Sequence, residues 1–173
     1  MALGAGNTLR EFMAEPKENG GRKSVEIKRF TKELLNDVIA FEMLLREEED
    51  FWGWEINDAY IAAVRDSFDD SSFGSAVSFL AYKDGKAVGR IDATVISSHF
   101  DGSRKAYLDW ICVAKRYRHK GIAQELMKSL REYFRSQGIR IMVGLIDGNP
   151  EAQRFYRSID NAMIRDEGIW IDL

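Results

Sequence analysis

One stretch, residues 106–137, constrains the fold more than any other part of the chain. It begins with an apolar strand from Ala106 to Ala114, typical of a strand buried on both faces. A turn and then a helix that begins near Gly121 follow. The helix carries an apolar residue at every fourth position: Ile122, Leu126, Leu130 and Phe134. Gly138 predicts the end of this helix, so the pattern indicates a strand–turn–helix unit.

The turn between this strand and this helix concentrates positive charge. Its cationic residues are Lys115, Arg116, Arg118, His119 and Lys120. The first turn of a helix presents unpaired backbone N–H groups and a partial positive charge. Gly121 has no Cβ, so a phosphate could approach the main chain closely at the helix start. These properties together predict a phosphate or pyrophosphate site at the turn.

The sequence from Arg118 to Ala123 resembles R/Q-x-x-G-x-G/A, the acetyl-CoA signature of the GNAT N-acetyltransferase superfamily. The apolar strand before it and the amphipathic helix after it are similar too. Further on, Asn149 and the pair Phe155-Tyr156 resemble the second conserved element of that family. The resemblance implies an enzyme that moves an acetyl group from acetyl-CoA to a primary amine by direct attack. The alternative is an ordinary strand–helix–strand unit whose glycine only allows tight packing.

The totals of the chain predict one globular domain with its own core. It has 173 residues, of which 45% are hydrophobic, and its formal net charge of −3 predicts no nucleic-acid partner. No apolar run approaches the roughly 20 residues that span a membrane, and no signal-peptide segment is evident. We therefore expect a cytoplasmic protein without a membrane partner. One cysteine, Cys112, excludes an internal disulfide, and His99 and His119 lack companions for a metal site.

The rest of the pattern predicts a mixed sheet with helices on both faces. Strands are expected at residues 24–30, 76–82, 87–97, 140–146, 163–165 and 169–173, and further helices at 31–48, at 59–68 and from 150. Thr31 is placed to cap one helix, and Asn149 another that has Pro150 in its first turn. Asp84-Gly85 predicts a hairpin turn.

This order, β-αα-βββ-α-β-α-ββ, is the order of the GNAT fold, which the resemblance extends over residues 23–173. Residues 1–22 contain several glycines and are expected to form a flexible N-terminal arm. Asp160-Asn161 stands where the family usually has Gly-Phe, so the path of the last hairpin, and any homodimer contact it makes, is less defined by the resemblance.

The resemblance also implies which residues bind acetyl-CoA. The main chain of Ile111, Cys112 and Val113 would contact the pantetheine arm and the thioester carbonyl. The pyrophosphate would lie on Arg118, His119, Lys120, Gly121, Ile122 and Ala123. Asn149 matches a residue that often contacts pantetheine, although its capping position alone explains an asparagine there.

Two residues are candidates for proton transfer. Tyr156 matches the family tyrosine that acts as a general acid near the CoA sulfur; the alternative is packing against Phe155. Asp109 stands inside an apolar strand, where burial would raise its pKa and suit it as a base. It could instead lie at a wet strand end or pair with an arginine, and residues 47–50 are rival bases. Cys112 is predicted to be a small core residue rather than a nucleophile.

Charge is uneven along the chain, which bears on the acceptor. Residues 46–70 hold nine acidic against two basic residues, and 111–140 eight basic against two acidic. In the family, the loop between the first two helices contacts the acceptor; here it contains Glu48, Glu49, Asp50, Trp52 and Trp54. Carboxylates beside indole rings suit a cationic amine, such as an aminoglycoside or polyamine. The strand at 106–114 and the region before it also weakly resemble aminoglycoside 3-N-acetyltransferases. A solvated acidic helix end, a peptide acceptor, an acetyl-CoA sensor and a nucleotide-binding regulatory domain remain alternatives.

Overall fold

The computed structural model describes residues 25–49, 55–164 and 171. Within these residues the chain forms a five-stranded sheet whose strands follow sequence order. They are β1 (Glu26–Arg29), β2 (Val77–Lys83), β3 (Lys86–Ser97), β4 (Arg104–Val113) and β5 (Met142–Gly144). Neighbouring strands are antiparallel except for β4 and β5, which are parallel, so the predicted mixed sheet is confirmed.

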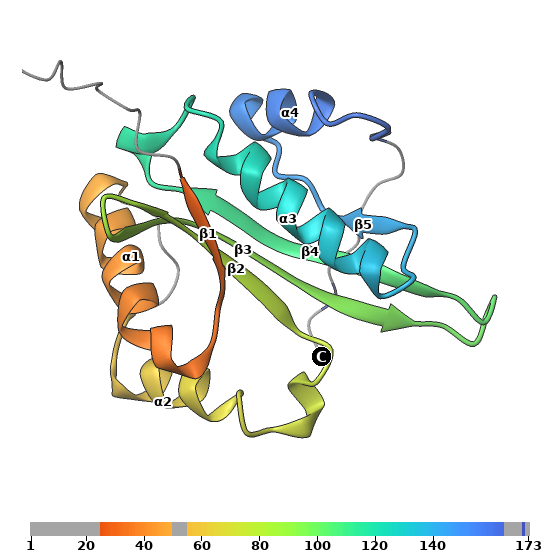
Figure 1. The fold of residues 1–173 in the computed structure, drawn as a ribbon, viewed down its shortest axis with the longest axis horizontal. Helices are drawn as coiled ribbons and strands as arrows, with labels where there is room; N and C mark the ends of the chain where they lie inside the picture. Colours follow the sequence, from red (N-terminus) through yellow and green to blue (C-terminus); the bar gives the residue numbers. More distant parts are fainter. Residues whose placement is uncertain (1–24, 50–54, 165–170, 172–173) are drawn as a thin grey trace, which may run out of the picture.

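Helices cover both faces of this sheet. They are α1 (Leu35–Glu48), α2 (Asp58–Asp66), α3 (Ile122–Ser136) and α4 (Pro150–Arg157), with 3-10 turns at Lys32–Leu34, Ser71–Phe73 and Lys115–Tyr117. Figure 1 shows α1 and α2 on one side of the sheet and α3 and α4 on the other. The predicted order of elements is therefore confirmed from the first strand to α4.

Three predicted details are different in the structure. Thr31 precedes a 3-10 turn and its side chain makes no capping hydrogen bond, so that cap is wrong. The strand predicted at 140–146 is reduced to β5, because pairing with β4 ends there. Met163, Ile164 and Ile171 are not in a strand; the other residues of the predicted closing hairpin, like the N-terminal arm, lie outside the described residues.

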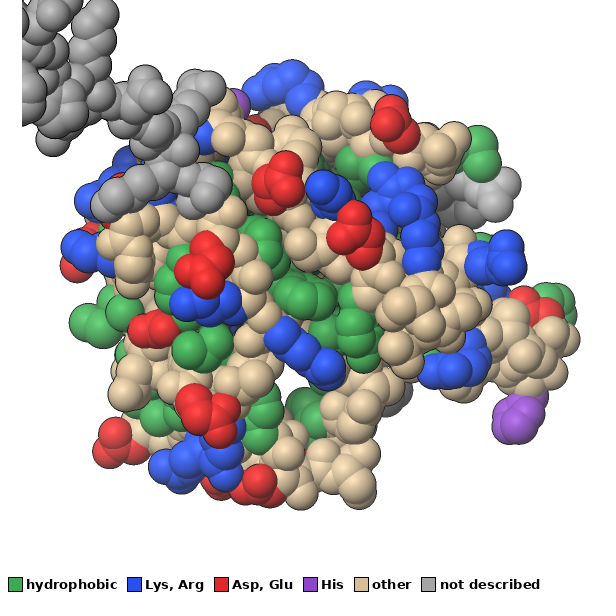
Figure 2. Space-filling model, viewed as in Figure 1, with side chains coloured by type: hydrophobic (Ala, Val, Ile, Leu, Met, Phe, Trp, Pro, Cys, Tyr) green, Lys and Arg blue, Asp and Glu red, His purple; other side chains and the backbone are tan. Residues whose placement is uncertain are grey.

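The face of the molecule seen in Figure 2 carries both signs of charge. Lys and Arg side chains are interspersed with Asp and Glu over both helical layers, and hydrophobic side chains are visible between the layers. An extended basic patch is the footprint of nucleic-acid binding. The described residues on this face form no such patch. In the described part of the chain, no helix has the length and apolar character to cross a membrane. The cytoplasmic location and the homodimer stay predictions.

The predicted apolar stripe anchors α3 to the sheet. Each of its four members is at most 2% exposed: Ile122, Leu126, Leu130 and Phe134. They pack in one cluster with Val88 and Ile91 of β3. At the C-terminal end, the N–H of Gly138 donates to Arg135 and that of Ile139 to Phe134, the paired bonds of a Schellman motif. Both predicted ends of this helix are confirmed.

The pairing of β4 changes in the middle of the strand. Asp92 of β3 pairs with Trp110, and the next residue of β3 pairs with Leu108, so Asp109 is the extra residue of a β-bulge. On its other edge, β4 pairs with β5 only through residues 106–108. Beyond Leu108, this edge of β4 has no partner strand in the described residues.

Gly144 fixes the place where β4 and β5 separate. A Cβ at this position would lie 3.0 Å from the carbonyl oxygen of Leu108 and 3.2 Å from its Cβ. Glycine allows the two backbones to come this close without a shift of either strand. The pair Leu108–Gly144 is the last of the parallel register, so the strands part immediately after this close approach.

We predict that Leu130→Ala lowers the free energy of unfolding by about 2–5 kcal/mol, because it opens a cavity under α3. Leu130 is fully buried, whereas Glu132 on the same helix is exposed and provides the control Glu132→Ala. Urea denaturation followed by circular dichroism measures both. Equal stability of the two variants would contradict the packing described for α3.

Candidate functional site

A cavity of about 940 Å³ lies where β4 and β5 separate. Its volume is within the range of about 300–1,000 Å³ that small-molecule sites occupy. Predicted site residues that line it are Glu49, Asp109, Ile111, Cys112, Val113, Arg118, His119, Gly121, Ile122, Ala123, Asn149 and Tyr156. The fold thus gathers predicted residues from both halves of the chain around one cavity.

Asp109 lines the cavity, but its surroundings differ from those predicted from the sequence. The sequence pattern predicted a carboxylate buried in an apolar strand, but the side chain is exposed. The bulge interrupts the alternation of β4 at this residue, so the expectation of a strand buried on both faces is wrong here. Burial therefore gives no argument for Asp109 as a base. Its position in the wall still allows contact with an acceptor.

The start of α3 offers unpaired backbone donors to the cavity. The first bond within the helix runs from the N–H of Glu125 to Gly121 O at 3.1 Å, so the three preceding amides have no helical acceptor. Gly121 has φ +83°, and apart from its neighbours in the chain no heavy atom lies within 4 Å of the place a Cβ would take. An anion can therefore reach these amides and the positive end of the helix.

Arg118 is held at this helix start from three sides. Its Nε donates to the carbonyl oxygen of Val113 at 2.9 Å, and its Nη1 lies 2.8 Å from Glu49 Oε1 and 3.4 Å from Glu151 Oε2. Partial burial opposes the charge of Arg118, but the hydrogen bond and charge of Glu49 outweigh it and raise the pKa of the guanidinium. Glu151 also lies 3.3 Å from His119 Nε2.

Other predicted residues lie beside the cavity rather than in its lining. Lys120 Nζ donates to the carbonyl oxygen of Arg116 at 2.7 Å. Glu48 accepts a hydrogen bond from the N–H of Lys115 at 2.5 Å and pairs with Arg116. The acidic end of α1 is thus neutralised by the basic turn. Asp50, Trp52 and Trp54 lie outside the described residues, so the predicted acceptor set stays a prediction.

Tyr156 and Asn149 enter the cavity wall from α4 and its cap. Burial, followed by the charge of Asp147, raises the pKa of Tyr156, so its hydroxyl keeps its proton at neutral pH. The centroid of its ring also lies 5.2 Å from that of Phe155. Tyr156 therefore both lines the cavity and packs against Phe155 as the alternative predicted. Asn149 Oδ1 accepts from the N–H of Ala152 at 2.8 Å, which confirms the predicted cap.

Cys112 lines the cavity as a protonated thiol. Burial raises its pKa to about 11. Because the thiolate is the reactive form, this supports the prediction that Cys112 is a wall residue and not a nucleophile.

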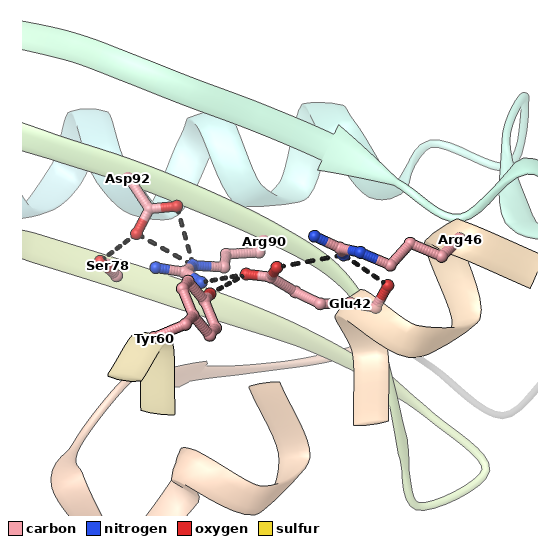
Figure 3. A network of polar contacts seen from close by, with 6 residues as sticks. All are labelled: Glu42, Arg46, Tyr60, Ser78, Arg90 and Asp92. Carbon is pink, nitrogen blue, oxygen red and sulfur yellow. Dashed lines mark hydrogen bonds and ion pairs between the residues drawn. The ribbon is translucent and has the colours of Figure 1, made fainter. Parts of the chain in front are cut away.

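A buried polar network that the sequence did not predict lies between the helices and the sheet (Figure 3). It reaches the wall residue Trp110 through Arg90. Glu42 of α1 is 2% exposed; it accepts a hydrogen bond from Tyr60 of α2 at 2.5 Å and pairs with Arg90 of β3 at 3.0 Å. Arg90 also pairs with Asp92 at 2.8 Å and lies 5.9 Å from the Trp110 ring centroid. The contacts therefore join α1, α2 and the sheet at one point.

The ionisation of this network follows from its burial. Burial opposes the charge of Arg90, but Asp92 and then Glu42 outweigh it and raise the pKa of the guanidinium. Burial and the carboxylate of Glu42 raise the pKa of Tyr60 to about 12, so the phenol remains a donor. Since α2 has no buried residue, the bond from Tyr60 is one of the contacts that fix this helix against the site.

Comparison with known proteins decides the family. The model of the Acetyltransferase (GNAT) family matches residues 22–159, which is most of the chain. The chain belongs to the GNAT family. It is an acetyl-CoA-dependent N-acetyltransferase, as the resemblance implied. Among proteins with curated descriptions, none matches the chain by sequence.

Solved structures agree on the GNAT fold. A soil-metagenome aminoglycoside acetyltransferase, meta-AAC0020, in complex with sisomicin has a TM-score of 0.73 at 18% identity, covering 86% of this chain and 96% of its own. AAC(6')-Iy in complex with a CoA–acetylneamine bisubstrate analogue scores 0.69 at 20% identity, covering 87% and 98%. Ribosomal-protein-alanine N-acetyltransferase from Brucella melitensis biovar Abortus 2308 scores 0.67 at 19% identity, covering 87% and 99%. At these identities the likeness concerns the fold.

The residues of this GNAT chain fit its cosubstrate. The open space before Gly121 and the amides that begin α3 suit a diphosphate, and the open edge of β4 suits an extended arm. The wall residues Tyr107, Trp110 and Glu151 were not predicted from sequence. The one local signal of the cavity in the sequence was Gly144, because a glycine inside a predicted strand indicates that another backbone segment comes close to it.

We predict that Glu42→Ala lowers the free energy of unfolding by about 3–5 kcal/mol, because Arg90 then keeps a buried charge with one partner fewer. Glu47 is exposed on the same helix, so Glu47→Ala is the matched control. Chemical denaturation of both variants provides the comparison. A loss below about 1 kcal/mol would mean that the network contributes little to docking α1 and α2.

We predict that Gly121→Glu weakens CoA binding at least about tenfold, because it places bulk and negative charge against the diphosphate. Gly121→Ala separates the two causes, since alanine brings only backbone strain at φ +83° and should weaken binding less. Isothermal titration calorimetry with CoA measures both. Wild-type affinity of Gly121→Glu would exclude this helix start as the diphosphate site.

Proposed function

We propose that this GNAT protein acetylates a small cationic amine, such as an aminoglycoside or a polyamine. The observation that carries the proposal is the charge of the cavity wall, where four carboxylates outnumber the two guanidinium groups of Arg118 and Arg154. The carboxylates are those of Glu49, Asp109, Asp147 and Glu151. The aromatic side chains of Tyr107 and Trp110 lie in the same wall. Carboxylates and aromatic rings together attract ammonium groups. Aminoglycoside acetyltransferases among the structural neighbours are consistent with this acceptor class.

In this proposal the chain binds acetyl-CoA through its backbone. The amides of residues 122–124 and Arg118 hold the diphosphate, and the open edge of β4 at Ile111, Cys112 and Val113 binds the pantetheine arm. Acetyl-CoA supplies an acetyl group activated as a thioester. A backbone N–H on the β4 edge donates to the carbonyl oxygen and stabilises the negative charge that develops during attack.

Two side chains move protons in this mechanism. Asp109 accepts a hydrogen bond from the acceptor's ammonium and passes its proton to solvent, leaving a neutral amine. The amine nitrogen forms a bond to the carbonyl carbon, and its second proton also passes through Asp109 to solvent. The carbon–sulfur bond then breaks and leaves a neutral amide. Tyr156, whose hydroxyl is protonated at neutral pH, donates its proton to the departing sulfur. Bulk water then restores the proton of Tyr156.

A peptide amine is the second candidate acceptor. The ribosomal-protein-alanine N-acetyltransferase has a similar fold, and a peptide N-terminus is also a cationic amine. The acidic wall favours an acceptor with several positive charges over one with a single charge, which is why the small polycation is preferred.

An acceptor screen tests the proposal. Purified protein is mixed with acetyl-CoA and sisomicin, spermidine or an alanine-terminated peptide, and release of free CoA thiol is followed with time. We expect turnover with sisomicin or spermidine. Turnover with the peptide alone would overturn the acceptor class. CoA binding without turnover would favour a sensor, and competition by ATP but not by CoA in a thermal-shift assay would favour a nucleotide-binding regulatory domain.

We predict that Tyr156→Phe lowers kcat about 10- to 100-fold and changes the Kd of CoA less than about twofold, because the ring is kept and only the acid is lost. Tyr133 is half-buried on α3, so Tyr133→Phe is a matched change elsewhere. Steady-state rates and calorimetry give the two quantities. A wild-type kcat for Tyr156→Phe would remove its role as the acid.

A further inference from the structure

Arg118 is gripped by carboxylates from two separate helices. Glu49, directly after α1, binds the guanidinium with both oxygens, Oε1 at 2.8 Å from Nη1 and Oε2 at 3.0 Å from Nη2. Glu151, in the first turn of α4, approaches the same Nη1 at 3.4 Å. We call the two carboxylates that bind Arg118, those of Glu49 and Glu151, the carboxylate clasp. Two-point pairing of this kind occupies the fork that arginine otherwise offers to a phosphate.

The clasp lies where the cosubstrate's negative charge is expected. Arg118, Glu49 and Glu151 line the same cavity as Gly121, whose following amides begin α3. Glu151 also reaches His119 at 3.3 Å, so it neutralises a second cation of the turn. Like charges at short distance repel, and this repulsion is strongest where solvent is partly excluded. The side chain of Glu49 is only 18% exposed.

If Arg118 separates from the clasp, the carboxylate of Glu49 loses its positively charged partner. A partly buried carboxylate without a partner is costly, and a positive group that takes the place of Arg118 removes this cost. Resting on the proposed function, we propose that the diphosphate of acetyl-CoA displaces Glu49 and Glu151 from Arg118, and that Glu49 then binds a cationic group of the acceptor. Cosubstrate binding thus creates part of the acceptor site, and the two ligands bind cooperatively.

A purely structural role for these contacts predicts the opposite change in CoA affinity. If the clasp only fastens α1 to α4, removing a carboxylate loosens the phosphate site and weakens CoA binding. If the carboxylates compete with the diphosphate, removing one strengthens CoA binding. The sign of the change therefore separates competition from a structural role.

Calorimetry with CoA measures this sign in Glu49→Gln and Glu151→Gln. We expect each variant to bind CoA about 3- to 10-fold more tightly than wild type. Glu132→Gln removes the same charge from an exposed position on α3 and should change the Kd less than about twofold. Unchanged or weaker binding in both clasp variants overturns the proposal. Glu151 is 42% exposed, so its variant remains informative if Glu49→Gln folds poorly.

A second titration, with sisomicin as the acceptor, tests whether Glu49 binds the acceptor once CoA is bound. In wild type, saturating CoA should tighten sisomicin binding, and Glu49→Gln should abolish that effect while Glu132→Gln retains it. Sisomicin binding that is independent of CoA in wild type overturns this part of the proposal. Failure of wild type to bind CoA would instead overturn the proposed function itself, so the two failures are distinguishable.

Discussion

The short parallel pairing of β4 and β5 is the constraint on which the site depends. Only residues 106–108 of β4 take part, and the contact ends at Gly144. A backbone edge inside a protein must find hydrogen-bond partners. An extended molecule with amides of its own supplies them, and the pantetheine arm of acetyl-CoA is such a molecule. In the proposed function, the gap in the sheet is therefore the surface that binds this arm.

The same strand leads directly into the proposed anion site. Between Val113 at the end of β4 and Ile122 at the start of α3 the chain makes one short basic turn. A single continuous segment thus provides an open edge for an extended arm and free amides for a phosphate. Since α3 is anchored by four buried side chains, the distance between these two surfaces is set by the core and not by a mobile loop.

The parts of the structure that sequence predicted are those with local causes. The stripe of α3, the Asp84-Gly85 turn and the Asn149 cap each depend on residues a few positions apart. The bulge at Asp109 depends on the register between β3 and β4, and the bond between Arg118 and Glu49 joins residues 69 positions apart. No periodicity in one segment encodes such contacts. The sequence therefore located the helix start at Gly121 but misjudged the surroundings of Asp109.

The protonated state of Cys112 has a consequence for the product. Free CoA carries a thiol, and this reaction releases it within a cavity whose wall contains the chain's single cysteine. Thiol–disulfide exchange requires a thiolate, and burial keeps this sulfur protonated with a pKa of about 11. The enzyme should therefore release CoA without being captured as a mixed disulfide when the surrounding pool becomes oxidised.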